Sequence, residues 1–243
     1  MSDADLLEQI VQEIDARLRA AGSPERADQQ RAYLKSSLEF YGVAVPVLRR
    51  EVLAVLAAHP GLDHDDVVAL AAALWDAPVH DRRAAAVEVL TARVRDLGPD
   101  DVGLLERLLR ESGTWALSDN LSASVVGDVV ARHPDELGPV LDRWSTDDDF
   151  WLRRASMLAL LVPLRRGGGD FPRFARYADA MIEEQEFFIR KAIGWVLRDT
   201  SRRRPELVFE WALPRAARMS GVTFREVVKH LSPEQRAALE AAR

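Results

Sequence analysis

The sequence predicts an all-α protein, an α-solenoid in which pairs of helices repeat along the chain. Three observations lead to this fold class. Apolar residues recur with helical spacing through nearly all of the 243 residues. No run of four or more residues alternates apolar and polar side chains with β-branched enrichment, as a strand would. Similar short blocks return every 35 to 37 residues, a period typical of stacked two-helix repeats.

The helical spacing is clearest in three segments of the first half of the chain. It runs from Leu6 to Leu18, from Val67 to Leu74 and from Leu104 to Leu109. Proline and glycine divide the chain into segments of roughly 11 to 20 residues, so we expect about a dozen helices joined by short loops. The dividing positions are Ser23-Pro24, Val45-Pro46, His59-Pro60-Gly61, Ala77-Pro78, Gly98-Pro99, His133-Pro134, Gly167 to Gly169, Pro205, Pro214 and Pro233.

Composition predicts an ordinary globular chain, which we expect to form a single domain over residues 1–243. Apolar residues make up 48% of the chain and charged residues 30%, and the formal net charge is -6. A uniform surface with this charge would repel nucleic acid. Cysteine is absent, which excludes disulfides, thiolate metal sites and cysteine nucleophiles. The five histidines have no metal-ligand spacing, so we expect no metal and no cofactor.

Two features favour a cytoplasmic location with no membrane contact. The N-terminal stretch is acidic and amphipathic and lacks the basic and apolar regions of a signal peptide. The longest uncharged apolar run, Ser156 to Leu164, has half the length that a membrane helix needs.

The repeats align four charged residues. Phe150-Trp151-Leu152-Arg153-Arg154-Ala155 matches Phe187-Phe188-Ile189-Arg190-Lys191-Ala192 in character at every place, with an offset of 37 residues. Steps of 35 to 37 connect Arg83, Asp119, Arg154 and Lys191. We call these four the charged row and expect them at equivalent places on successive helices that line a concave face. A solvated face is the plainer interpretation of any single member.

Two of the six tryptophans lie in phase with the charged row. Trp115 precedes Asp119 by four residues and Trp195 follows Lys191 by four, one helical turn in each case. We expect the other four, Trp75, Trp144, Trp151 and Trp211, to be core residues. Indole faces attract cations, so the pair predicts a cationic ligand in a basic groove.

These residues resemble the alkylpurine DNA glycosylases of the AlkD type, which are built from HEAT-like repeats. The resemblance extends from about residue 30 to residue 231. It is carried by Tyr33-Leu34-Lys35 with Tyr41-Gly42-Val43 and Pro46, by Trp115-Ala116-Leu117-Ser118-Asp119, by Phe150 to Ala155, by Phe187-Phe188-Ile189-Arg190-Lys191-Ala192-Ile193-Gly194-Trp195-Val196-Leu197-Arg198, and by Arg225-Glu226-Val227-Val228-Lys229-His230.

The resemblance implies a monofunctional DNA glycosylase that hydrolyses the N-glycosidic bond of N3- or N7-alkylated purines in duplex DNA, without a metal and without base flipping. It implies that Asp119 is the essential carboxylate, that Trp115 and Trp195 are the active-site tryptophans, and that Arg154 is the catalytic arginine. Two positions depart from the family pattern: Ala116 stands where Asp is frequent, and Arg153 where Gln is common. Both departures alter the charge of the groove but remove no catalytic group.

The expected partner is double-stranded DNA that contains alkylated purines, bound by a monomer associated with the nucleoid. Residues 150–230 hold 16 Lys+Arg against 9 Asp+Glu, a net charge of +7, while the remainder carries -13. Phosphate contacts dominate affinity for nucleic acid, and the basic region suits them. The expected DNA-binding residues are Tyr33, Lys35, Arg83, Arg153, Arg190, Lys191, Arg198, Arg225 and Lys229.

A second hypothesis is a non-catalytic HEAT-repeat protein that binds damaged or branched DNA or serves as a protein-interaction scaffold. A binder of phosphates needs no carboxylate such as Asp119 among its cations, which favours the glycosylase.

Overall fold

The computed structural model describes residues 3–243, and over that range it confirms the all-α prediction. Its only β-type contact there is one isolated bridge between Glu39 and Val79. The chain divides into two compact units, Met1–Leu121 and Ser122–Arg243, and each is described by itself. The prediction of a single domain remains a prediction.

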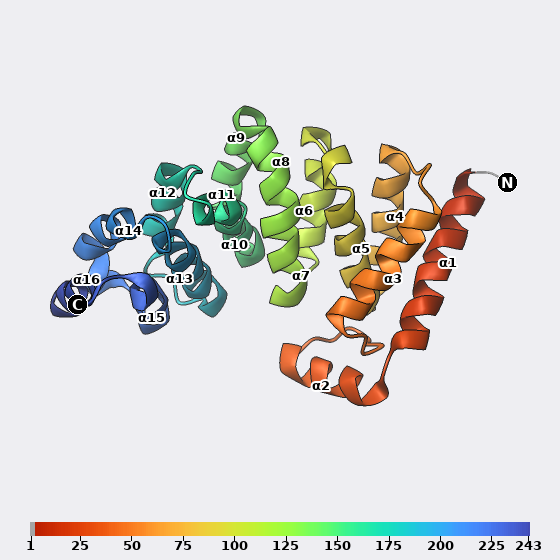
Figure 1. The fold of residues 1–243 in the computed structure, drawn as a ribbon, viewed down its shortest axis with the longest axis horizontal. Helices are drawn as coiled ribbons and strands as arrows, with labels where there is room; N and C mark the ends of the chain where they lie inside the picture. The colour runs from red at the N-terminus through yellow and green to blue at the C-terminus, as the bar shows by residue number, and fades with distance from the viewer. Residues whose placement is uncertain (1–2) are drawn as a thin grey trace. The chain divides into compact units, whose positions relative to one another are not determined.

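The first unit contains seven α-helices within the described range (Figure 1). Ile10, Ile14 and Leu18 form the fully buried face of the first helix, which packs against α3 and α4. Helices α4 and α5 pack against each other, and α5 also contacts α3 and α7. The helices are α1 (Asp3–Ala21), α2 (Pro24–Leu34), α3 (Val45–Ala58), α4 (His64–Asp76), α5 (His80–Ala92), α6 (Val102–Arg110) and α7 (Trp115–Asn120), with 3-10 turns at Val94–Asp96 and Pro99–Asp101.

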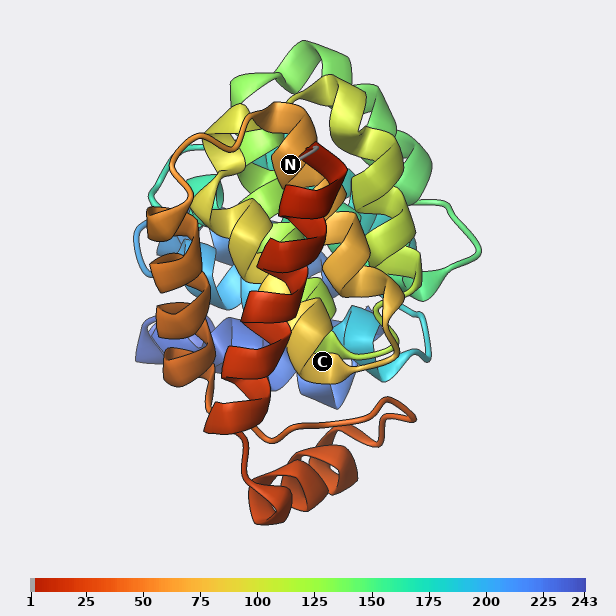
Figure 2. The same ribbon diagram turned by 90° about the vertical axis from the view of Figure 1, so that its right-hand side faces the viewer.

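Helix α2 lies beyond the C-terminal end of α1 (Figures 1 and 2). Its sequence is polar and buries only Ala27, so hydrogen bonds to the following loop hold it in place. Arg26 and Gln30 donate to the carbonyls of Gly42 and Val43, at 3.0 and 3.2 Å. Gly42 has a φ of 77°, and a side chain there would collide with the backbone of α2, so glycine is required.

The second unit contains the nine remaining α-helices of the described chain. Helix α13 is central: it packs against α10, α11, α14 and α15. The helices are α8 (Gly127–Arg132), α9 (Pro134–Trp144), α10 (Phe150–Leu158), α11 (Leu161–Arg165), α12 (Phe171–Met181), α13 (Phe187–Ser201), α14 (Pro205–Ala212), α15 (Gly221–Val227) and α16 (Pro233–Ala241), with 3-10 turns at Leu213–Arg218 and Val228–His230.

Residues 3–243 thus hold 16 α-helices, more than the dozen expected, and two of the additional breaks interrupt otherwise continuous helical stretches. Helix α7 continues through a π-helical turn at Leu121–Val126 into α8. Helices α10 and α11 are separated at Ala159 and Leu160, because Pro163 of α11 has no N–H to donate to the carbonyl of Ala159 four residues earlier.

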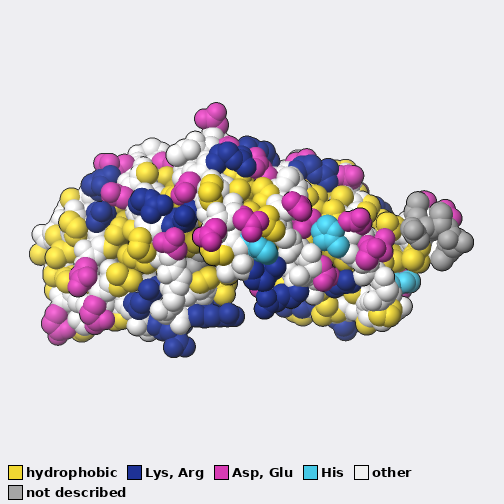
Figure 3. All heavy atoms as spheres, turned by 90° about the horizontal axis from the view of Figure 1, so that it is seen from above, with side chains coloured by type: hydrophobic (Ala, Val, Ile, Leu, Met, Phe, Trp, Pro, Cys, Tyr) yellow, Lys and Arg dark blue, Asp and Glu magenta, His cyan; other side chains and the backbone are white. Residues whose placement is uncertain are grey.

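Within their helices, the members of the charged row keep the sequence alignment to within one residue. Asp119, Arg154 and Lys191 are each the fifth residue of their helices, α7, α10 and α13, and Arg83 is the fourth of α5. Polar contacts also recur at about one repeat: the Trp75 indole donates to Glu111 at 2.9 Å, 36 residues on. In the space-filling view of Figure 3, basic groups are interspersed with acidic and hydrophobic side chains within each unit.

Candidate nucleic-acid interface and active-site residues

In the first unit, Trp115 and Asp119 occupy the two turns of α7. The Thr114 hydroxyl caps the helix by accepting a hydrogen bond from the backbone N–H of Ala116 at 3.4 Å. Trp115 and Asp119 are both half-buried. The ring of Tyr33 meets the Trp115 indole edge to face, with centroids 6.0 Å apart and an interplanar angle of 87°. The structure therefore brings two of the predicted site aromatics together.

Tyr33 and Lys35 lie at the exposed C-terminal end of α2. The Tyr33 side chain is 74% exposed, an unusual exposure for a tyrosine in a folded chain. Lys35 ends the helix with a positive φ of 50° and is exposed. The loop after them is anchored by buried Asp81, which accepts the backbone N–H groups of Tyr41 and Val43 at 2.8 and 2.9 Å.

Arg83, the first member of the charged row, is held by backbone carbonyls. Its guanidinium donates to the carbonyl of Trp75 at 3.1 Å and to that of Glu111 at 2.7 Å. It also lies 5.0 Å from the centroid of the Trp75 ring. Burial lowers the pKa of Arg83, against the attraction of Glu111 and Asp76. The structure thus gives Arg83 a role in joining α4 to the end of α6.

In the second unit, Arg154 is almost entirely buried. It is 2% exposed, it donates to the carbonyl of Phe188, and its guanidinium carbon lies 5.8 Å from the centroid of the Phe188 ring. The Phe188 ring in turn contacts the rings of Phe150 and Trp151, and the three ring centroids lie 4.6 to 6.1 Å apart. Arg154 therefore fixes the first turn of α13 against α10.

Arg153 and Arg190 both bind the turn between α12 and α13. Arg153 makes a bidentate ion pair with Glu184, at 3.1 and 3.0 Å, and also donates to the carbonyls of Asp147 and Asp148. Arg190 donates to the carbonyl of Glu184 at 2.7 Å and to the side chain of Gln185. Both of these predicted DNA-binding residues therefore bind the same turn.

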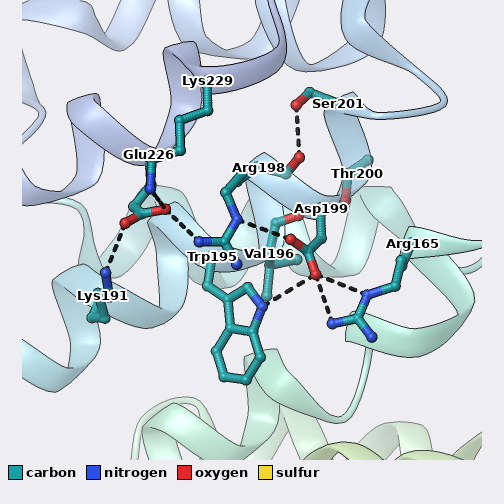
Figure 4. Close-up of polar contacts among 10 residues, drawn as sticks. All are labelled: Arg165, Lys191, Trp195, Val196, Arg198, Asp199, Thr200, Ser201, Glu226 and Lys229. Carbon is teal, nitrogen blue, oxygen red and sulfur yellow. Dashed lines mark hydrogen bonds and ion pairs between the residues drawn. The ribbon is translucent and has the colours of Figure 1, made fainter.

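Three predicted DNA-binding cations meet at a single carboxylate, Glu226 of α15 (Figure 4). Lys191, Arg198 and Lys229 donate to it at 2.7, 2.6 and 2.9 Å. Glu226 is 5% exposed. Burial by itself disfavours the charged carboxylate, but the hydrogen bonds and charges of these cations lower its pKa to about 2. Glu226 is therefore ionised near neutral pH, and the four residues together carry a charge of +2.

Trp195 is joined to the same cluster through Asp199. Its indole N–H donates to Asp199 Oδ2 at 3.2 Å. Asp199 also accepts from Arg165 Nε at 2.8 Å and, through Oδ1, from Arg198 Nε at 3.0 Å. Burial opposes ionisation of Asp199, but the hydrogen bonds from Arg198 and Arg165 outweigh it and lower its pKa. Figure 4 shows the indole and both guanidinium groups pointing toward this carboxylate.

The Trp195 side chain borders an open, basic cavity of about 820 Å³ in the second unit. Positive charge on its walls exceeds negative charge, which suits an anionic ligand. The lining residues are Arg165, Arg166, Trp195, Arg198, Asp199, Arg202 and Arg203. Arg225, a further predicted DNA-binding residue, is exposed on α15 and lies outside this cavity.

Exposure separates the six tryptophans as predicted. Trp75, Trp144, Trp151 and Trp211 are 0 to 8% exposed, which confirms them as core residues. Trp115 and Trp195 are half-buried. The two indoles that remain accessible are therefore the two in phase with the charged row.

The sequence-based search missed Asp199, Glu226 and Arg165. Asp199 follows Trp195 by four residues, so helical spacing alone could have paired them. Glu226 precedes Lys229 by three residues, so helical spacing could have paired these two as well. The pairs Glu226–Lys191 and Arg165–Asp199 gave a weaker signal, because their members lie 35 and 34 residues apart, about one repeat.

Residues 3–243 offer neither a metal-binding cluster nor a membrane-spanning helix. No group of three or more His, Cys, Asp or Glu side chains within residues 3–243 is arranged to hold a metal ion. In the same part of the chain, no helix combines the length and apolar character needed to span a bilayer.

Comparison with solved structures identifies the fold. A protein of Enterococcus faecalis described as a predicted DNA alkylation repair enzyme is 22% identical, with a TM-score of 0.79 over 87% of this chain and 97% of its own. AlkD2 from Streptococcus mutans is 17% identical, with a TM-score of 0.60 over 85% and 99%. These likenesses show the helical-repeat fold.

Sequence comparison supplies the family. No curated protein matches the chain significantly. The sequence model of the DNA alkylation repair enzymes, however, matches residues 14–231, which is most of the chain. The protein therefore belongs to the family of DNA alkylation repair enzymes.

Proposed function

We propose that the protein is a monofunctional DNA glycosylase that hydrolyses the N-glycosidic bond of N3- and N7-alkylated purines in duplex DNA without flipping the base. One observation carries the proposal: among six tryptophans, only Trp115 and Trp195 remain partly exposed, each one helical turn from a member of the charged row. Membership of the DNA alkylation repair family supports it.

The proposed chemistry needs no general acid. Alkylation at N3 or N7 makes the purine cationic, so the base is already a good leaving group. Bond cleavage moves positive charge to the deoxyribose, and an anionic Asp119 would stabilise that charge and orient the attacking water. The indole faces of Trp115 and Trp195 would bind the cationic base and sugar, at about 0.5 to 2 kcal/mol each. A neutral purine offers neither advantage.

We assign the remaining predicted residues to the DNA backbone. Arg154, held at the Phe188 carbonyl, is the arginine proposed to bind a phosphate beside the lesion. Tyr33, Lys35 and Arg225 are exposed. The other proposed contacts are Arg83, Arg153, Arg190, Lys191, Arg198 and Lys229, whose side chains are already ordered by partners within their own units.

The decisive experiment measures bases released from methylated duplex DNA by mass spectrometry, with the wild type beside Asp119→Asn. The wild type should release 3-methyladenine or 7-methylguanine and leave abasic sites. Asp119→Asn should lose 100-fold or more of the rate, since removal of one stabilising group for developing charge typically costs about 10²- to 10³-fold.

Asp128→Asn is the matched control, because that carboxylate pairs with Arg132 four residues away on α8 and belongs to no proposed contact. It should keep the wild-type rate. Undiminished release by Asp119→Asn would refute the role of Asp119. Absence of any released base, together with micromolar or tighter binding to duplex DNA, would instead identify a non-catalytic DNA-binding protein.

A further inference from the structure

The carboxylate of Asp199 binds the polar edge of the half-buried Trp195 indole. Trp195 and Asp199 are one turn apart on α13, and the indole N–H donates to Oδ2 at 3.2 Å. The indole is half-buried, while Asp199 is 4% exposed. A partly exposed ring is therefore tied at its polar edge to a buried anion.

The acceptor itself is held from two helices. Arg165 of α11 donates to Oδ2 through Nε at 2.8 Å and lies 2.6 Å from it through Nη2. Arg198 of α13 donates to Oδ1 at 3.0 Å and continues to Glu226 of α15 at 2.6 Å. Both oxygens of Asp199 are thus occupied, and the carboxylate has little freedom to rotate. Charge-assisted hydrogen bonds of this kind are short and strongly directional.

We propose that Asp199 is a positioning residue that fixes the orientation of the Trp195 indole, so that the ring face is already aligned when a cationic purine nucleotide binds. The inference rests on the role proposed for Trp195. A cation–π contact depends on the cation lying over the ring face, and a freely rotating indole would offer its face for only part of the time. Misplacement by about 1 Å costs reactions of this type up to about 100-fold.

Asp199 also forms ion pairs, so substituting it lowers the stability of the protein as well as releasing the indole. The two effects must be separated. Asp142 of α9 provides the comparison within the same unit. It accepts a hydrogen bond from the Tyr177 hydroxyl and pairs with Arg173 and Arg176. Asp142→Asn therefore also removes a carboxylate that binds one aromatic residue and two arginines, but it leaves Trp195 unaltered.

The direct readout is the indole N–H signal of Trp195 in a ¹⁵N–¹H spectrum of the free, full-length protein. Six tryptophans give six such signals, and Trp195→Phe identifies the relevant one by its loss. Asp199→Ala should shift that signal by several tenths of a part per million and increase its picosecond-to-nanosecond motion. Asp142→Asn should leave it in place. An unchanged Trp195 signal in a folded Asp199→Ala protein would overturn the proposal.

The functional readout is single-turnover release of a methylated purine. Asp199→Ala should slow release between about 10-fold and 100-fold, while its affinity for undamaged duplex should not weaken, because the substitution removes a negative charge beside Arg165 and Arg198. Asp199→Asn tests the same point if the alanine variant unfolds, since it keeps the shape of the side chain but weakens the acceptor.

A double variant completes the test. Combining Trp195→Phe with Asp199→Ala should slow release no more than Trp195→Phe alone, because the carboxylate then has no indole N–H to hold. Additive losses would show that Asp199 acts elsewhere and would contradict the inference. A wild type with no glycosylase activity would contradict the proposed function instead, and the spectrum would still decide whether Asp199 holds the indole.

Discussion

Glu226 is the residue on which three neighbouring cations depend, two of them on α13 and one in the 3-10 turn after α15. Lys191, Arg198 and Lys229 would repel one another if they shared a site without an anion, and Glu226 accepts a hydrogen bond from each. The carboxylate is nearly inaccessible to solvent, so removing it would leave three neighbouring charges partly unbalanced. Removing one member of a buried charge cluster lowers the free energy of unfolding more than removing one member of a surface ion pair does.

The pKa of Glu226 makes its contribution to stability dependent on pH. Its pKa falls from 4.5 to about 2 in the folded protein. The contribution is therefore complete above about pH 4.5 and is lost as the pH falls toward 2. The shift corresponds to roughly 3 kcal/mol. We expect Glu226→Gln to lower the free energy of unfolding by up to this amount at pH 7 and by progressively less below pH 4.5, measured by urea denaturation at several pH values.

The control for this prediction is Glu183→Gln. Glu183 also binds an arginine, Arg218, about one repeat away, at 3.1 Å, but its side chain is 69% exposed. Its loss should change the free energy of unfolding by less than about 1 kcal/mol at every pH. Equal effects of the two substitutions would mean that burial does not strengthen the Glu226 cluster.

At the scale of the element, the contact of α13 with α15 depends on Gly194. A Cβ built at Gly194 would lie 2.8 Å from the Cβ of Glu226 and 3.3 Å from the Cα of Thr223, so the helices approach too closely for any side chain there. The absence of a side chain on α13 therefore places Glu226 within reach of Lys191 and Arg198.

Gly194→Ala should destabilise the protein although alanine favours helix. The propensity gain is about 1 kcal/mol, and overpacking against the backbone of α15 typically costs about 1 to 3 kcal/mol. We expect a lower urea midpoint and a smaller pH dependence between 4.5 and 2, because Glu226 is displaced. Gly103→Ala on α6 meets no atom within 4 Å and should be neutral or stabilising. A stabilising Gly194→Ala would show that the two helices move apart easily.

The positions of the charged residues along their helices were the feature of the site that the sequence predicted best. Asp119, Arg154 and Lys191 fall at the same place in three helices because the repeat period is nearly constant. The roles of Arg83 and Arg153 were harder to predict. Arg83 binds backbone carbonyls, which every residue carries, and Arg153 binds the carbonyl of Asp147 and the side chain of Glu184, 31 residues away. Periodicity locates a side chain on a face, but it does not show which oxygen that side chain reaches. The helix break near Pro163 was likewise hidden within an apolar run.

At the scale of the whole molecule, the net charge of -6 is a poor guide to DNA binding. Residues 150–230 carry +7, and several of their cations lie together around Glu226 or line the cavity beside Trp195. Exposed charges are screened within about 10 Å at 0.1 M salt. A phosphate bound at this surface is therefore attracted by the charges of the local cluster far more than it is repelled by the net charge of the whole protein.

This difference between local and average charge can be measured with two substitutions that have the same formal effect. Glu226→Gln and Glu183→Gln each change the net charge from -6 to -5. If the local cluster controls binding, Glu226→Gln should strengthen affinity for undamaged duplex at 50 mM salt by about 3- to 10-fold and steepen the salt dependence by about 0.9 in log–log slope, the value for one further phosphate contact. Glu183→Gln should change neither, because its partner Arg218 is not a proposed DNA contact.

Fluorescence anisotropy between 50 and 400 mM salt, at pH 7 where both variants are folded, measures both quantities. Equal strengthening by the two variants would show that average charge governs binding, and weaker binding by Glu226→Gln would show that the carboxylate serves the DNA contacts chiefly by holding the three cations in place.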